Sequence, residues 1–263
     1  MMYRNIFPFR IGSTSYVIPD SIIPNVILMS NYVDDIELLF FESASSTSLL
    51  SNPEIKELKH IAEKKKIQYS VHCPIDISDW VENKNKMIYY SEQIRIIYEL
   101  TKALPVSGYI VHLDGLNKCS DQDQIIQWKE STEQLCRRIH QIKDLNRSKI
   151  CIENLKYDPS FNIDIVNKFS FSYCLDIGHL WKYNYEWENI IEIFLKKTEI
   201  IHLHGVYNGK DHCSVKLHNQ NQTDSLFSVL SKKYSNVLTI ELFSLNELLE
   251  SLEYLKELWE KQR

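Results

Sequence analysis

Short apolar runs alternate along the chain with longer segments in which apolar residues recur at helical spacing. The runs are rich in β-branched and aromatic residues, and their short length favours strands. Most are nearly continuous in apolar residues, which is typical of parallel strands covered by helices. Eight runs predict strands: Phe9–Ser15, Asp35–Glu42, Gln68–Cys73, Gly108–Leu113, Lys149–Glu153, Phe171–Asp176, Glu199–His204 and Val237–Phe243.

The segments between the runs carry the usual signals of helix ends. Pro53 occupies a first-turn position with Asn52 as its expected N-cap, and Asp121 is expected to open a long helix. The polar stretch Tyr207–Thr223 is the longest loop expected after a strand. Eight strand–helix repeats predict an α/β protein with a closed (β/α)8 barrel of the TIM type. In such a barrel, this loop should lie over the mouth.

Length and composition narrow the class of protein. The 263 residues are near the ~250 typical of one such barrel, so we expect residues 1–263 to form a single domain. Hydrophobic residues make up 44% of the chain, which is enough for a sizeable core. We expect a cytoplasmic protein with no membrane partner, because no signal-like start and no run of ~18 apolar residues are present. The net charge of −5 counts against nucleic acid as the main partner.

Histidine, aspartate and glutamate mark the ends of the predicted strands. A parallel barrel gathers the C-terminal ends of its strands at one mouth, so these side chains would meet there. Imidazole and carboxylate together suit zinc or manganese, whereas calcium and magnesium prefer oxygen ligands. The candidate ligands are His72, His112, Glu153, Asp176, His179, His202, His204, Asp211, His212 and Glu241.

Two arguments favour a metal site over a set of unrelated buried residues. Burying several carboxylates and imidazoles together without a cation is costly through repulsion and desolvation. Side chains also alternate across a strand, so His202 and His204 can both point inward. The ligands are too many for one four-coordinate ion, and we therefore expect two or three divalent ions, zinc before manganese.

Aromatic residues near the strand ends are candidates for contact with a large planar substrate. Tyr16 lies near the end of the first predicted strand, and Tyr183 and Trp187 follow the sixth. Core packing of the next helix explains the last two equally well. Asp114, two residues after His112, is expected to hold that imidazole in orientation.

The ordered ligand set resembles the xylose-isomerase-like barrel superfamily, which includes the endonuclease IV group of apurinic-site nucleases (AP endonuclease family 2). The resemblance implies three zinc ions. The first would take His72, His112 and Glu153. The second would take Glu153, Asp176, His202 and Glu241. The third would take His179, Asp211 and His212.

Two departures from that pattern concern the third ion. The nucleases space the last pair as Asp-x-His, whereas Asp211 and His212 are adjacent. His204 also stands where they carry a different polar residue. The sequence leaves open whether His204 replaces one of the other ligands.

The N-terminal third resembles a narrower branch of the superfamily. The runs FRIGSTSYVIPDSIIPNV and VDDIELLFFE are similar to those of the cobamide-remodelling phosphodiesterases (CbiR-type). Those enzymes cleave the phosphodiester in the nucleotide loop of corrinoid cofactors and release the lower-ligand nucleoside. The resemblance implies a metal-dependent hydrolase with a small-molecule corrinoid substrate. In it, Glu153 would orient the attacking water, and His179 and His212 would stabilise the departing oxygen.

Three alternatives stand beside this hypothesis. A sugar isomerase or epimerase would use the same barrel with one metal and would not need His72 and His112. An apurinic-site endonuclease would fit all the ligands, but its polyanionic substrate disagrees with the acidic net charge. A non-catalytic metal- or corrinoid-binding protein would need no open coordination position.

Overall fold

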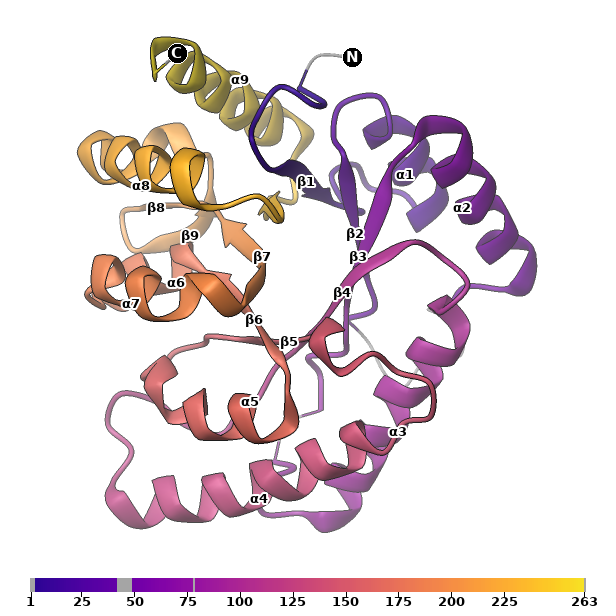
Figure 1. Ribbon diagram of the computed structural model, residues 1–263, viewed down its shortest axis with the longest axis vertical. Coiled ribbons are helices and arrows are strands. Elements are labelled where there is room, and N and C mark those ends of the chain that lie inside the picture. Colours follow the sequence, from indigo (N-terminus) through magenta and orange to yellow (C-terminus); the bar gives the residue numbers. More distant parts are fainter. Residues whose placement is uncertain (1–2, 42–48, 78, 263) are drawn as a thin grey trace.

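The computed structural model describes residues 3–41, 49–77 and 79–262, and it confirms the closed barrel. Parallel strands pair in the order β1-β10-β7-β6-β5-β4-β3-β2, so the first strand closes the barrel against the last (Figure 1). Each barrel strand overlaps one predicted run. They are β1 (Arg10–Thr14), β2 (Asp35–Leu39), β3 (Gln68–His72), β4 (Val106–Val111), β5 (Ile150–Glu153), β6 (Ser172–Asp176), β7 (Thr198–Leu203) and β10 (Val237–Ile240).

Helices surround the strands and cover the outside of the barrel (Figure 1). They are α1 (Ile22–Met29), α2 (Asn52–Lys65), α3 (Lys84–Thr101), α4 (Gln122–His140), α5 (Ile163–Phe169), α6 (Ile177–Lys182), α7 (Trp187–Phe194), α8 (Gln220–Lys233) and α9 (Leu245–Gln262). Short 3-10 turns span Arg147–Lys149, Pro159–Asn162, Leu195–Lys197 and Val215–Leu217. Among the described residues, no helix is long and apolar enough to cross a membrane.

Two predicted helix starts have different outcomes. Asp121 is the N-cap of α4, as predicted, and its side chain accepts a hydrogen bond from the backbone N–H of Gln124. Helix α2 begins one residue earlier than expected, so the prediction of Asn52 as its cap is wrong. Ser51 is the N-cap, and its N–H and hydroxyl donate to Glu54 Oε2 at 2.7 and 2.6 Å. The first of these bonds satisfies the backbone N–H of the N-cap, which has no partner within the helix.

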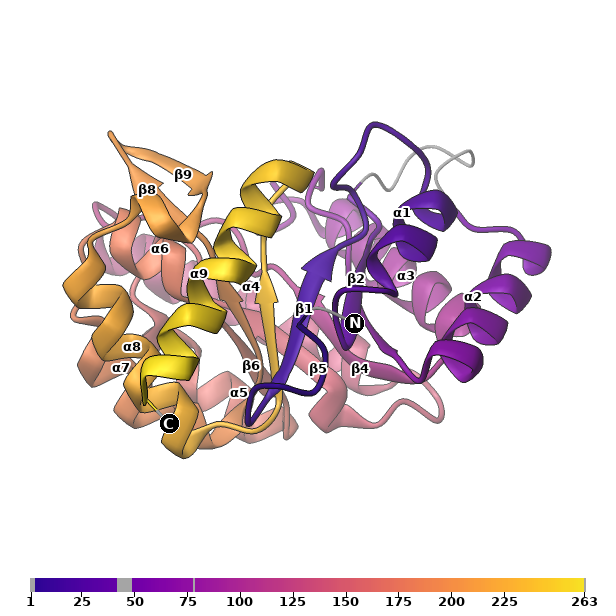
Figure 2. The same cartoon turned by 90° about the horizontal axis from the view of Figure 1, so that it is seen from above.

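The expected loop Tyr207–Thr223 is more ordered than the sequence suggested. It contains β9 (Lys210–Cys213), which forms an antiparallel hairpin with β8 (Gly205–Tyr207), and the start of α8. Figure 2 shows this hairpin on the side toward which the arrowheads of β1 and β10 point. The hairpin therefore borders the barrel mouth, where the predicted ligands gather. Glu42, the expected end of the second strand, lies outside the described residues.

The barrel interior is layered beneath these ligands. Ile110, Cys151, Cys174 and Ile200 form, with Val237, a buried apolar cluster separate from the main core. The first four residues each lie two positions before a predicted ligand on the same strand run. Because side chains alternate along a strand, the ligands stand on the same inward face, one layer nearer the mouth.

Candidate metal centre

The first group of ligands comes from strands β3, β4 and β5. Glu153 Oε2 lies 2.9 Å from His112 Nε2 and 3.4 Å from His72 Nε2. His72 Nδ1 is 2.9 Å from the carbonyl oxygen of Cys73, where it is placed to donate its proton. That bond leaves Nε2 with its lone pair directed at the site. His112 Nδ1 lies 3.8 Å from Asp114 Oδ2, an ion-pair distance that agrees with the predicted supporting role.

The second group joins His202 with Glu241 and with Glu37, a residue that the sequence analysis missed. His202 Nδ1 lies 3.3 Å from Glu241 Oε2 and 3.7 Å from Glu153 Oε1. Its other nitrogen, Nε2, lies 2.9 Å from Glu37 Oε2. Glu37 thus holds the Nε2 proton and turns Nδ1 toward the two other carboxylates. The available signal was an acidic residue inside an apolar strand run, since a buried charge needs a partner.

The third group is built around Asp176. Its Oδ1 accepts the backbone N–H of His179 at 2.7 Å and lies 3.4 Å from His204 Nε2. Its Oδ2 lies 3.1 Å from His179 Nδ1. The rings of His204 and His212 stack with centroids 4.1 Å apart. One ligand atom from each of the three histidines lies within 4.8 Å of the other two, so a single ion could contact all three.

Backbone features hold two of these imidazoles in place. A Cβ on Gly178 would lie 2.1 Å from Cε1 of His204, so the position beside this ring requires glycine. His212 has a φ of 49°, in the left-handed region that non-glycine residues rarely adopt. Such a conformation costs roughly 1–3 kcal/mol. Gly178 thus leaves room for the His204 ring, and the left-handed backbone at His212 sets the direction of its side chain.

The structure places Asp211 apart from the imidazoles of the third group. Its Oδ2 lies 2.5 Å from Lys182 Nζ, in an ion pair. Asp211 and His212 are neighbours on β9, but the left-handed backbone at His212 breaks the regular alternation of side chains there. His204 joins His179 and His212 where the resemblance implied Asp211.

The predicted substrate-contacting aromatics lie in different surroundings. Tyr16 is 50% exposed, and the ring centroid of Tyr183 lies 6.1 Å from that of His179. Tyr16 is therefore accessible from solvent, and Tyr183 borders the third ligand group. Trp187 is only 3% exposed and packs in the hydrophobic core, because α7 turns its apolar face inward. It therefore does not line the mouth.

Two phenylalanines that the sequence analysis did not select border the ligands instead. The ring of Phe41 meets that of His72 edge-on at a centroid distance of 5.1 Å. The ring of Phe243 lies 5.3 Å from that of His212. The two phenylalanine rings are 6.2 Å apart, so they form an aromatic border along this side of the mouth. Their position just past the ends of β2 and β10 was the available signal.

The donor atoms fit divalent cations. Four buried atoms of the predicted ligands make no hydrogen bond with any described residue, namely His202 Nδ1, His204 Nε2, Asp176 Oδ2 and Glu241 Oε2, and Oε1 of the neighbouring Glu37 makes none either. A buried polar atom without a partner costs about 1–3 kcal/mol. The four ligand atoms come from the end of β6, the end of β7 and the segment after β10. Cations held by the ligand groups would satisfy them, and the mixed nitrogen and oxygen donors suit zinc or manganese.

Without a cation, the imidazoles and carboxylates neutralise one another. Burial by itself lowers the pKa of His204, but Asp176 outweighs burial and raises that pKa to about 9. Burial also opposes ionisation of Glu153, yet His112 and His202 hold the pKa of its carboxyl well below the usual range. The metal-free site is therefore a network of imidazolium and carboxylate groups. Metal ions must displace protons from it.

The similarity of the chain to known proteins agrees with this geometry. A sequence model of the xylose isomerase-like TIM barrel family matches residues 33–258. The chain belongs to this family. The family includes isomerases, epimerases and endonuclease IV, so its members are enzymes of several classes. No curated protein sequence is similar enough to match the chain.

Several solved structures share the fold over nearly the whole chain. A D-tagatose 3-epimerase-like protein is 20% identical with a TM-score of 0.79, over 96% of this chain and 98% of that one. The 3-keto-D-glucoside 4-epimerase YcjR from E. coli is 13% identical with a TM-score of 0.72, over 95% and 98% of the two chains. Endonuclease IV from Thermus thermophilus is 14% identical with a TM-score of 0.68, over 97% and 100%. At these identities, the similarity establishes the family fold and leaves the reaction to the site residues.

Proposed function

We propose that this protein is a metal-dependent phosphodiesterase that binds two or three divalent ions. The observation that carries the proposal is the position of Glu153. Its Oε2 faces the imidazoles of His72 and His112, whereas its Oε1 lies 3.6 Å from His179 Nδ1 and 3.7 Å from His202 Nδ1. A carboxylate with each oxygen in a different ligand group is suited to bridge two ions, as two-metal phosphate chemistry requires.

The residues of the site suit hydrolysis of a phosphodiester. Bound divalent ions would supply Lewis acidity and an activated water at neutral pH. Glu153 is placed to orient that water and to accept its proton. His179 and His212 have partly exposed side chains, at 15% and 27%, on the open side of the site. From there they can hold the departing oxygen directly or through a third ion.

The proposed substrate is a corrinoid cofactor, cleaved at the phosphodiester of its nucleotide loop. The similarity of the N-terminal runs to the cobamide-remodelling phosphodiesterases supports this choice. A second support is the aromatic border of Phe41 and Phe243, since a corrinoid offers one phosphodiester beside a large apolar ring system. A DNA substrate is disfavoured because 35 acidic residues outnumber 30 basic ones.

A sugar epimerase is the second candidate. The epimerase structures described above share the fold, and the four residues of a one-metal site, Glu153, Asp176, His202 and Glu241, are all present. Such an enzyme, however, has no use for the pair His72 and His112, which faces Glu153 from the other side.

One substrate panel separates the candidates. Zinc- and manganese-loaded protein is incubated with adenosylcobalamin, an abasic duplex oligonucleotide and a ketohexose, and the products are separated by chromatography. The proposal expects a corrinoid phosphomonoester or nucleoside product and no change in the other two. Nicked oligonucleotide or an epimerised sugar with intact corrinoid would contradict it.

A further inference from the structure

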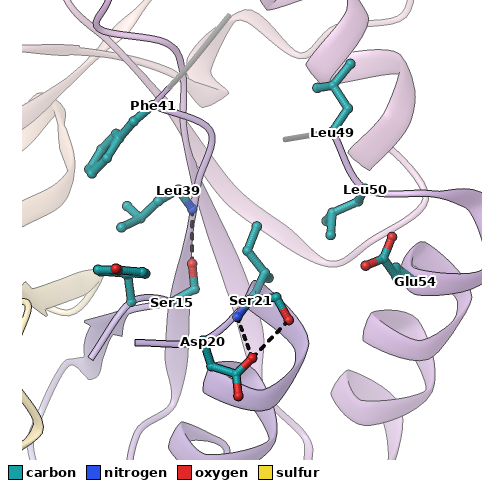
Figure 3. A pocket seen from close by; sticks show the side chains of 10 residues that line it. Ser15, Asp20, Ser21, Leu39, Phe41, Leu49, Leu50 and Glu54 are labelled. Atoms are coloured by element: carbon teal, nitrogen blue, oxygen red, sulfur yellow. Dashed lines mark hydrogen bonds between the residues drawn. The ribbon is translucent and has the colours of Figure 1, made fainter. Parts of the chain in front are cut away.

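A cavity lies beside the metal centre. Its volume is about 400 Å³, and it is formed by the loop after β1, the end of β2 and the segment that leads into α2. Figure 3 shows Leu39 and Phe41 along one side of it and Leu50 and Glu54 along the other, with Ser21 below. Most of its wall is apolar, and none of the predicted metal ligands contributes to it.

Phe41 connects this cavity to the metal ligands. The ring of Phe41 lines the cavity and also meets the ring of His72 edge-on, with an interplanar angle of 84°. His72 belongs to the first ligand group, where a phosphate would lie between Glu153 and the mouth. A molecule with its phosphate there would therefore place the adjoining substituent against Phe41 and into the cavity.

The charges around the cavity exclude a second phosphate. Asp20 and Glu54 supply carboxylates, and no lysine or arginine is among the described residues that line it. Glu54 Oε2 is held by Ser51, and these hydrogen bonds lower the pKa of the Glu54 carboxyl. Asp20 Oδ1 accepts the N–H of Ser21 at 2.7 Å. The second oxygen of each carboxylate can accept an N–H from a ligand, whereas an anion would be repelled.

We propose that this cavity binds the bicyclic nitrogen base of the nucleoside that the enzyme releases, an inference that rests on the proposed function. The apolar wall and the Phe41 ring suit a planar heterocycle, and the carboxylates suit its nitrogen donors. A cavity of this volume holds a base with its ribose, but a corrin ring with its side chains is too large for it. The corrin would then remain outside, at the mouth.

The placement of the N-terminal runs agrees with this assignment. Residues 15–22 and 39–41 supply most of the cavity lining, and they lie in the two runs that resemble the cobamide enzymes. Glu37, in the second run, positions His202, but neither run contributes a predicted metal ligand. Recognition of the base would give the cavity-lining residues of both runs a role in the site.

The test measures binding of the free nucleoside rather than turnover. Ser21 is the N-cap of α1, is exposed and makes no side-chain capping bond, so Ser21→Trp fills the cavity at little cost to the helix. Titration calorimetry of the zinc-loaded protein uses 1-ribosyl-5,6-dimethylbenzimidazole as the probe, with ribose 5-phosphate as a comparison. Ser21→Trp should weaken nucleoside binding by about tenfold or more. Glu54→Lys should weaken it too and should favour ribose 5-phosphate, because it replaces an acceptor with a cation.

A control variant and two outcomes complete the test. Ser235 is exposed just before β10, at the opposite end of the barrel, so Ser235→Trp should bind the nucleoside as the wild type does. Zinc content and thermal midpoint confirm that each variant is folded. Equal nucleoside affinity in Ser21→Trp and Ser235→Trp would overturn the base-binding cavity even if the corrinoid is cleaved. If Ser21→Trp alone loses nucleoside affinity, while the wild-type protein does not cleave the corrinoid, the base-binding cavity is supported and the proposed phosphodiesterase activity is refuted.

Discussion

His202 Nε2 and Glu37 Oε2 lie 2.9 Å apart, and both side chains are fully buried. The two residues belong to β7 and β2, which are not neighbours in the barrel, so their contact crosses its interior. It fixes the orientation of the His202 ring and directs Nδ1 toward Glu153 and Glu241. Glu37 is therefore a positioning residue for the metal centre.

The first prediction concerns this contact. Glu37→Gln keeps the side-chain shape but removes the charge that holds the Nε2 proton of His202. Loss of such a supporting carboxylate reduces metal affinity by about 10–100-fold. Competition with a chromophoric chelator measures the affinity for zinc.

Asp35→Asn is the matched control for that experiment. Asp35 is also fully buried on β2, two residues earlier on the same face, where Ser70 donates to its carboxylate at 2.9 Å. The Asp35→Asn substitution should change the thermal midpoint of the protein but not its affinity for zinc. Wild-type affinity in folded Glu37→Gln would show that the contact does not position His202.

The second prediction concerns the proposed bridge. Glu153→Gln is nearly isosteric, so the fold should be kept. The change removes the negative charge shared by the two ligand groups, and we expect a loss of kcat of roughly a hundredfold or more. Turnover of the corrinoid is measured together with metal content. Near-normal turnover with metal still bound would place the bridging role on another residue.

Strand ends could be located from the sequence, but contacts across the barrel could not. His72, Glu153 and Asp176 end apolar runs, and the parallel barrel brings them together as predicted. Glu37 lies in the middle of its strand, so it carried no end-of-strand signal. Its importance follows from the alternation that points it inward and from a partner on the far side of the interior.

The third prediction separates His204 from Asp211. His204→Ala removes an imidazole from the third group and should lower the metal stoichiometry by one ion, measured by elemental analysis. Asp211→Asn breaks only the ion pair with Lys182, so the stoichiometry should be unchanged. The reverse pattern, with metal lost only from Asp211→Asn, would mean that metal binding rearranges the β8–β9 hairpin.

The hairpin also explains why the sequence could not decide whether His204 or Asp211 belongs to the third ligand group. A polar stretch after a strand predicts a loop, and a loop gives no rule for which side chains share a face. Lys210–Cys213 forms a strand, yet His212 has a left-handed backbone, so the regular alternation of a strand does not fix where Asp211 and His212 point either. Trp187 shows the same difficulty for a helix. An aromatic residue after a strand can line the mouth or pack in the core, and the packing of α7 places Trp187 in the core.

The fourth prediction concerns pH. The pKa of His204 is raised to about 9 in the metal-free protein, and that of His112 is raised as well, against burial, by Glu153. His204 is therefore protonated at neutral pH and must lose its proton to bind metal, and Glu153 favours the protonated form of His112 as well. Apparent zinc affinity should rise with pH. Calorimetry in two buffers of different ionisation enthalpy should detect proton release at neutral pH, and an absence of released protons would contradict the charged network.

The same shifts set the stability of the metal-free protein. A raised folded-state pKa means that His204 stabilises the fold fully below its ordinary pKa of 6.5 and loses this contribution as the pH rises through about 9. Glu153, whose pKa is lowered, contributes above its ordinary pKa of 4.5 and loses that contribution in acid. Both contributions are complete only between about pH 4.5 and 6.5. The thermal midpoint of the metal-free protein should therefore be highest in this range and fall at lower and at higher pH.

The most direct test of the central claim follows oxygen into the product. Metal-loaded protein is incubated with adenosylcobalamin in oxygen-18 water, the products are separated, and the mass of each is measured by mass spectrometry. Hydrolysis at phosphorus predicts a phosphomonoester that carries one oxygen-18 atom and a complementary product without it. Both products should form at least about a hundredfold more slowly with Glu153→Gln. Intact adenosylcobalamin after incubation with fully metal-loaded wild-type protein would contradict the assignment.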